Sequence, residues 1–294
     1  MSENRAPRGP IDRLLAANAW LVYLFFYLPI GLLIVFSFNE NENVSIWTGF
    51  SFRWYEAMLQ DDRILGALRN SLIVAFVSTI VATVLGTMLA LALERYRFRG
   101  RGTLDGIAYM PVIIPDVTMG VMLLIFFFQA IGLMDSWFGI GFNTGLGTIT
   151  LAHIAFNISF VAIVVRARLA QFDSSLEEAA ADLYASRWQT FRQITLPLIA
   201  PGVAGGALLA LTLSLDDVVV TQFVSGPGST TLPVYVFGLV RRGVTPLINA
   251  VSTVMLVASM VLVGISLGLQ RTRGGGGDDL EEDVLASSGA TVRQ

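Results

Sequence analysis

The sequence predicts an all-α, polytopic membrane protein that crosses the bilayer with six helices. Of its 294 residues, 54% are hydrophobic and only 14% are charged, whereas soluble domains average about 25% charged residues. Six apolar runs are each long enough to cross a bilayer core, which takes about 20 helical residues. These runs do not alternate apolar with polar residues, so they are not strands of a membrane barrel.

The first predicted helix follows a short N-terminal segment, residues 1–14. Residues 14–39 carry no charge and form a run longer than the 7–15 residues typical of a signal-peptide core, and no A-x-A site follows. We therefore expect a retained helix rather than a cleaved leader. The expected spans are 15–38, 70–93, 106–130, 147–166, 199–223 and 247–270, which together define a transmembrane domain over residues 15–270.

Two segments near the C-terminal end are not expected to cross the bilayer. Residues 225–246 are too short for two crossings, and Gly226, Pro227 and Gly228 should end the fifth helix. Thr230 or Thr231 can then cap a short helix with Pro233 in its first turn, at the outer face or dipping into the membrane. Residues 271–294 contain four consecutive glycines and an acidic block, which predicts a disordered tail.

Arginine placement predicts the orientation of the helices. All 19 basic residues are arginines, and six crossings put both termini on the same side. Fourteen arginines fall on that side, including the cluster Arg95, Arg97, Arg99 and Arg101, and five fall on the other. Cytoplasmic loops carry an excess of positive charge. We therefore expect both termini, and the loop between the fourth and fifth helices, to lie in the cytoplasm.

The composition argues against an enzyme. The chain has no cysteine, no lysine and one histidine, which excludes a thiolate metal site, a Schiff-base lysine and a Walker-type phosphate lysine. No nucleophile with a base and no phosphate-binding glycine loop is evident. We therefore predict no catalytic residue, no metal site, no cofactor in this chain and no nucleic-acid partner.

The loop at residues 174–197 is the most informative polar segment. Residues 177–181 have helix-forming composition, with an acidic start that suits the helix dipole. Three consecutive alanines leave little bulk, so another surface can approach the backbone closely. A second helical piece at 187–195 should end at Pro197, which opens the fifth crossing. From spacing alone, an ordinary amphipathic connector at the membrane surface fits equally well.

This loop resembles the cytoplasmic EAA loop of ABC importer permeases, in which E-A-A is followed by three residues, a glycine, a later phenylalanine and an L-P pair. The matching residues are Glu178, Ala179, Ala180, Phe191, Leu196 and Pro197, and Asp182 also fits. Tyr184 departs from the pattern because it stands at the usual glycine position, where a β-carbon strains the turn. The resemblance implies that the loop, over residues 176–197, docks on a separate ATPase subunit that binds ATP and Mg²⁺.

The resemblance extends to residues 25–39, 109–121 and 211–253, which are similar to the permeases of spermidine/putrescine ABC importers. It implies a type I ABC importer permease (MetI-like) fold in the bacterial inner membrane. It also implies a heterodimer with a related permease, two ATPase copies and an extracytoplasmic substrate-binding protein. The alternatives are an importer for ferric iron, thiamine or a phosphonate, a proton- or sodium-coupled transporter that uses Asp116, and a membrane enzyme.

Three intramembrane aspartates are candidate pathway residues for a small cationic substrate. An aspartate at the centre of a spanning helix costs about 2.5–3.5 kcal/mol on insertion scales, so it normally faces a partner or a wet cavity. Asp116 is expected near mid-depth, and Asp216 and Asp217 nearer the outer face. Neighbouring helix residues point about 100° apart, so Asp216 and Asp217 should not share one pore.

A structural role for these aspartates remains an alternative. They can bond to arginines or backbone groups of a partner permease. Pro111 and Pro115 should bend the third helix, and Asp116 can stabilise that bend. His153, in the fourth helix, is expected to be a hydrogen-bonded interior residue rather than a metal ligand.

Overall fold

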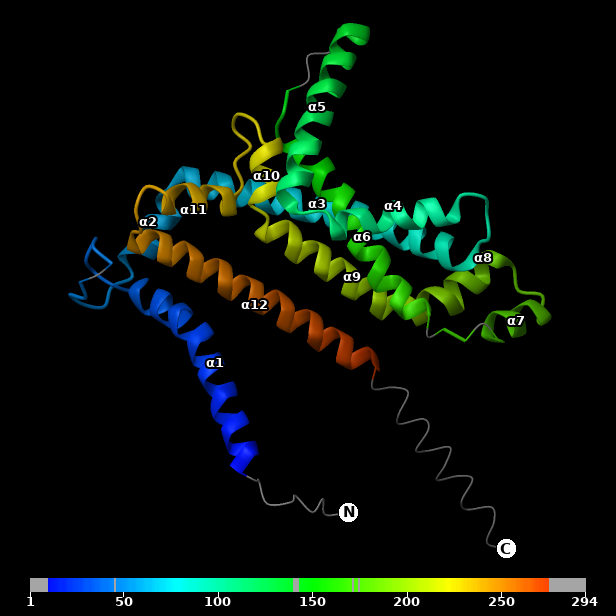
Figure 1. Ribbon diagram of the computed structural model, residues 1–294, viewed down its shortest axis with the longest axis horizontal. Coiled ribbons are helices and arrows are strands. Elements are labelled where there is room, and N and C mark those ends of the chain that lie inside the picture. The colour runs from blue at the N-terminus through cyan, green and yellow to red at the C-terminus, as the bar shows by residue number, and fades with distance from the viewer. Residues whose placement is uncertain (1–9, 45, 140–142, 171, 174, 275–294) are drawn as a thin grey trace, which may run out of the picture. The chain divides into compact units, whose positions relative to one another are not determined.

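The computed structural model describes residues 10–44, 46–139, 143–170, 172–173 and 175–274 (Figure 1). Most of the predicted N-terminal segment 1–14, most of the tail 271–294 and Ser174 at the start of the predicted loop lie outside the described residues. Within them, regular structure is helical apart from one isolated bridge between Asn39 and Phe50. The all-α prediction is confirmed.

Six helical segments among the described residues are long and apolar enough to cross a membrane, at 11–36, 62–95, 116–137, 146–169, 187–216 and 246–264. They overlap the six predicted runs. The helices in chain order are α1 (Pro10–Phe36), α2 (Arg53–Gln60), α3 (Asp62–Arg95), α4 (Arg101–Ile113), α5 (Asp116–Phe138), α6 (Leu146–Leu169), α7 (Ser175–Asp182), α8 (Arg187–Thr190), the π-helix η1 (Phe191–Thr195), α9 (Leu196–Asp216), α10 (Val219–Val224), α11 (Leu232–Val240) and α12 (Pro246–Gly274). Helix α12 continues to Gly274, the last described residue, so the predicted boundary at residue 270 lies within this helix and stays a prediction.

The chain divides into two compact units, and the first comprises residues 1–62 and 238–257. Its loop between α1 and α2 is organised by Asn39, whose side chain is fully buried. The amide of Asn39 donates to the Ile46 carbonyl at 2.8 Å, and its side-chain oxygen accepts the Thr48 amide at 3.2 Å. The Trp54 indole also donates to the Asn39 carbonyl, at 2.7 Å. The Asn39 side chain therefore satisfies a buried donor and an acceptor of the loop backbone.

The second unit comprises residues 63–237 and 258–294, and α6 is its central helix. Helix α6 packs against α9, α4 and α10, and α10 also packs against α5. Val161 of α6 is fully buried between two glycines. A β-carbon on Gly86 of α3 would come within 2.7 Å of the Val161 β-carbon, and one on Gly206 of α9 would come within 3.3 Å of the Val161 α-carbon. Small residues therefore let three helices approach closely, as is common in membranes.

The prediction of one continuous third helix is wrong, because the structure divides this segment into α4 and α5. Ile114 and Pro115 are both extended, with ψ of 130° and 138°. The ring of a proline disfavours helical geometry in the residue before it, so Ile114 leaves the helix. Pro111, in contrast, lies inside α4 without ending it. The predicted bend is therefore a break, and it occurs at Pro115.

The fifth predicted helix also differs at both ends. It ends at Asp216, because Asp217 is extended with ψ of 126°, and the glycines at 226 and 228 follow α10 instead. At its start, α8 runs through η1 into α9 without interruption, so Pro197 does not end the preceding piece. The wide π turn helps to accommodate a proline that has no N–H to donate. The short helix after Thr231 is confirmed as α11, with Pro233 in its first turn.

Candidate functional site

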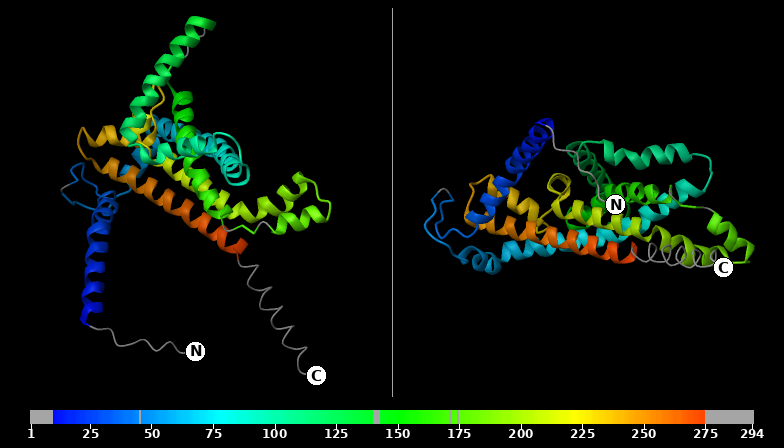
Figure 2. Two further views of the ribbon diagram at one scale, coloured as in Figure 1. Left: turned by 45° about the vertical axis from the view of Figure 1, so that its right-hand side comes forward. Right: turned by 90° about the horizontal axis from the view of Figure 1, so that it is seen from below.

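The predicted docking loop forms a helical hairpin at one end of α9. Helices α7 and α8 lie side by side there, and α7 also contacts η1 (Figure 2). Ser186 begins α8 with a capping box, in which its side chain accepts the Gln189 amide while Gln189 accepts the Ser186 amide. Reciprocal caps of this kind satisfy two backbone donors that a helix start leaves unpaired.

The turn between the two helices depends on Tyr184. Its φ is +59°, the one positive φ of a non-glycine residue in the part of the chain that the structure describes. The Ala185 amide donates to the Ala180 carbonyl and the Tyr184 amide donates to the Ala181 carbonyl. This pair of bonds is a Schellman motif, which needs a left-handed residue at the Tyr184 position. Tyr184 therefore keeps the glycine geometry, at a cost of about 1–2 kcal/mol.

The hairpin presents apolar side chains to its surroundings. Leu183 is 82% exposed, Tyr184 97% and Trp188 68%, and Trp188 packs on the half-buried Phe191 ring at 5.6 Å. A cluster of this kind on a small hairpin is typical of an interaction surface. Of the other predicted docking residues, those that are exposed are Glu178, Ala179, Asp182, Leu196 and Pro197.

Ala180 is the exception among the predicted docking residues. It is buried, with 7% of its surface exposed, whereas Ala179 and Ala181 on either side of it are open. The expectation that all three alanines offer space to another surface is therefore wrong for Ala180. Its small size serves packing within the chain instead.

A partly buried carboxylate, Glu177, ties the hairpin to the spanning helices, and the sequence analysis did not single it out. Arg95 and the Thr195 hydroxyl both donate to Glu177. Burial acts to raise the pKa of Glu177, but these two bonds outweigh it, so the pKa lies below its usual range. The same residues help to line a cleft of about 650 Å³ with Phe172 and Phe191.

All three predicted aspartates line one pocket of about 320 Å³, formed where α5 begins and where α9 gives way to α10. Asp216 and Asp217 share this pocket because α9 ends between them. The angle of about 100° between neighbouring side chains holds only within a helix, so it does not separate these two. This corrects the expectation that they diverge. The pocket also includes the rings of Phe156 and Phe160 from α6.

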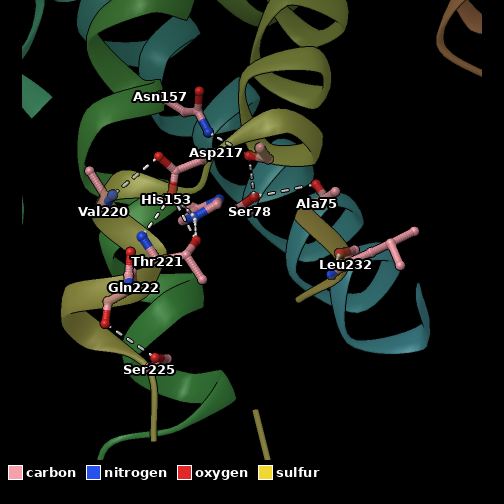
Figure 3. Close-up of polar contacts among 12 residues, drawn as sticks. Ala75, Ser78, His153, Asn157, Asp217, Val220, Thr221, Gln222, Ser225 and Leu232 are labelled. Atoms are coloured by element: carbon pink, nitrogen blue, oxygen red, sulfur yellow. Dashed lines mark hydrogen bonds and ion pairs between the residues drawn. The ribbon is translucent and has the colours of Figure 1, made fainter. Parts of the chain in front are cut away.

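Asp217 has a structural task within that pocket (Figure 3). Its carboxylate accepts the Val220 amide at 3.2 Å, and the Thr221 amide and hydroxyl at 2.7 Å each. His153 Nε2 lies 3.4 Å from the same carboxylate and 2.9 Å from the Thr221 hydroxyl. Asp217 therefore caps α10 and fixes it to α6, and His153 is the buried, hydrogen-bonded residue that the sequence predicted.

A second set of polar contacts secures the end of α9 (Figure 3). The Asn157 amide donates to the Ser214 hydroxyl at 2.8 Å, and Ser214 bonds to Ser78 of α3 at 3.0 Å. All three side chains are buried. Single polar residues in apolar helices are the sequence signal for such a network, since an unsatisfied group in a membrane is costly.

Asp116 and Asp216 are different, because both are exposed in the pocket. Among the described residues, neither makes an ion pair. Asp116 is the first residue of α5, directly after the break at Pro115, and its predicted mid-depth position in the membrane stays a prediction. The pocket therefore holds two accessible carboxylates beside aromatic rings, a combination suited to an organic cation.

A comparison of sequences places this architecture among known proteins. The putrescine transport system permease protein PotI of Escherichia coli is 45% identical over 242 residues, which cover 81% of this chain and 84% of that protein. The spermidine/putrescine transport system permease protein PotC of Haemophilus influenzae is 40% identical over 258 residues, covering 87% and 96%.

A comparison of structures agrees on the fold. The solved structure of a bacterial ABC transporter involved in the import of the acidic polysaccharide alginate aligns with a TM-score of 0.72 at 22% identity, covering 89% of this chain and 94% of that one. The fold is thus that of a type I ABC importer permease. A protein-family model matches residues 82–272. The chain therefore belongs to the family of binding-protein-dependent transport system inner membrane components.

Proposed function

We propose that this chain is a permease subunit of an ABC importer and that it carries polyamines, spermidine or putrescine, across the bacterial inner membrane. The observation that carries the substrate class is the pocket in which Asp116 and Asp216 are accessible beside Phe156 and Phe160. The polyamine permeases that are 40–45% identical to this chain support the same class.

The pocket suits a polyamine because the cation must lose water as it enters the membrane. Desolvating an isolated ammonium group costs many kcal/mol, and a nearby carboxylate offsets that cost. Asp217 is already engaged with Thr221 and His153. Asp116 and Asp216 therefore face the substrate, and the aromatic rings contact its methylene chain and ammonium groups.

The hairpin of α7 and α8 docks on a separate ATPase subunit, which binds ATP and Mg²⁺. The support for this is the exposed apolar surface around Leu183, Tyr184 and Trp188, together with the match to the EAA loop. The docking set comprises Glu178, Ala179, Ala180, Asp182, Tyr184, Phe191, Leu196 and Pro197, with Ala180 acting through the fold of the loop. The hairpin and both termini then lie in the cytoplasm, in keeping with the arginine distribution.

The complete importer contains this chain, a second related permease, two ATPase subunits and an extracytoplasmic substrate-binding protein. The binding protein delivers the polyamine to the outer side of the permease pair. Closure of the ATPase dimer moves the hairpin, and the permeases alternate between outward and inward access. The chain itself carries out transport and no chemical step.

Uptake competition tests the proposed substrate class. Cells that lack their own polyamine uptake are given this chain with its neighbouring genes and then labelled spermidine. We expect uptake that unlabelled spermidine or putrescine suppresses and that 2-aminoethylphosphonate, thiamine and ferric iron leave unchanged. Uptake should survive a protonophore as long as cellular ATP is maintained. Suppression by one of the other solutes, or loss with the proton gradient at constant ATP, would contradict the proposal.

A further inference from the structure

We infer that Glu177 is the positioning residue through which the docked hairpin moves the spanning helices. The inference rests on the proposed ATPase docking and adds a specific route for the movement. Glu178, the neighbouring acid that matches the EAA pattern, is exposed, whereas Glu177 points toward the helices. Glu178 is thus available to the ATPase surface, whereas Glu177 contacts the membrane domain.

Three elements meet at the Glu177 carboxylate. Glu177 lies in the first turn of α7. Its Oε2 accepts from Arg95 at the C-terminal end of α3, and its Oε1 accepts from the Thr195 hydroxyl at the end of η1. In the part of the chain that the structure describes, the Arg95–Glu177 pair is the one ion pair that links α7 to a spanning helix. A displacement of α7 therefore reaches α3 through the Glu177 side chain, and the same side chain acts on Thr195 beside the direct contacts of α7 with α8 and η1.

The connection is buried at Thr195 and only partly shielded from water at Glu177 and Arg95. Thr195 is 1% exposed, and the side chains of Glu177 and Arg95 are 23% and 28% exposed. The Arg95 guanidinium also lies over the Phe172 ring, at 4.9 Å from its centre. Hydrogen bonds that involve a charged group are stronger than neutral ones, and those shielded from water are less screened. The Thr195 end of the contact is therefore better shielded from water than an exposed surface pair.

The elements on the far side of this contact can pass the movement on. Glu94, next to Arg95, accepts from Arg166 Nε of α6 at 2.7 Å, and Arg166 also pairs with Asp105 of α4. Thr195 closes the π turn that joins α8 to α9. Turns of this type occur at functional sites, where they absorb changes of helical register. The end of α3 is therefore tied to α4, α6 and α7 at once.

The test uses the complete importer in proteoliposomes, with its ATPase and with a spermidine-loaded binding protein. Spermidine moved per ATP hydrolysed is measured for Glu177→Gln, Arg95→Gln and Thr195→Val. We expect the ATPase to remain bound and to keep its basal hydrolysis, while the ratio of transport to hydrolysis falls about tenfold. Arg97→Gln, which changes a neighbouring exposed arginine, should match the wild type.

Two rescue variants separate positioning from simple structural support. Thr195→Ser keeps the hydroxyl and should keep coupling, and the double swap Arg95→Glu with Glu177→Arg should recover part of what either single swap loses. Normal coupling in Glu177→Gln would overturn the inference, and so would loss of the bound ATPase from that variant, because Glu177 would then only hold the loop together. A wild-type complex without an ATPase or without transport would instead refute the proposed function, and this inference with it.

Discussion

Changing Asp116 and Asp216 together to asparagine is expected to lower spermidine uptake about a hundredfold while leaving the assembled complex intact. The two carboxylates are exposed in the pocket, and among the described residues neither makes an ion pair. Asparagine keeps the size and hydrogen-bonding of each side chain and removes its charge. A carboxylate about 4 Å from an ammonium group contributes up to about 4 kcal/mol at the effective dielectric of partly exposed protein sites. We expect about tenfold loss of uptake rate for each single variant and about a hundredfold for the pair.

The control for this experiment is Asp135→Asn, which makes the same change near the other end of α5, where the carboxylate lies outside the pocket. It should transport at the wild-type rate. Asp217→Asn is expected to behave differently from both, because it weakens the cap of α10 and should lower the yield of folded protein. Wild-type uptake by the Asp116/Asp216 double variant would show that the pocket does not bind the substrate.

Changing Tyr184 to valine is expected to release the ATPase from the permease, whereas changing it to glycine is expected to retain it. The turn requires a left-handed backbone at this position, with φ near the observed +59°. Glycine adopts it freely and should stabilise the hairpin by about 1 kcal/mol. A β-branched residue adopts it with strain of order 1–3 kcal/mol, enough to displace the Schellman turn. Co-purification of the ATPase with the tagged permease measures the difference.

The pair of variants is informative because both remove the exposed Tyr184 ring. If the ATPase is retained by Tyr184→Gly and lost by Tyr184→Val, the backbone of the turn is the requirement. Equal loss in both variants would mean that the ring itself is the contact. Retention in both would contradict the importance of the turn.

The six crossings could be predicted because each is an apolar run of sufficient length, and the length and hydropathy of a run are the main requirements for insertion. The positions at which the helices break could not be predicted from run length. Pro115 gave a visible signal, but whether a proline bends or breaks a helix depends on its neighbours, and Pro111 lies inside α4 unbroken. The break at Asp217 follows from an aspartate that caps the next turn, a pattern that the surrounding leucines and valines conceal.

The sequence predicted which aspartates belong to the candidate site but not that they line one pocket. The aspartates were found because charge is costly in a membrane, but their common pocket depends on two helix breaks. Glu177 was missed because Glu178 fits the EAA pattern. Only the direction in which each glutamate leaves α7 separates the two, and that depends on where Arg95 and Thr195 lie in the fold.

The most direct test of the account is purification of the tagged chain in detergent, after expression with its neighbouring genes, followed by an ATPase assay. We expect an ATPase subunit to co-purify and its hydrolysis to rise when both the binding protein and spermidine are added, but not with either one alone. That result would establish the docking hairpin and the substrate class together. A permease that purifies without an ATPase, yet transports spermidine when reconstituted alone, would contradict the account.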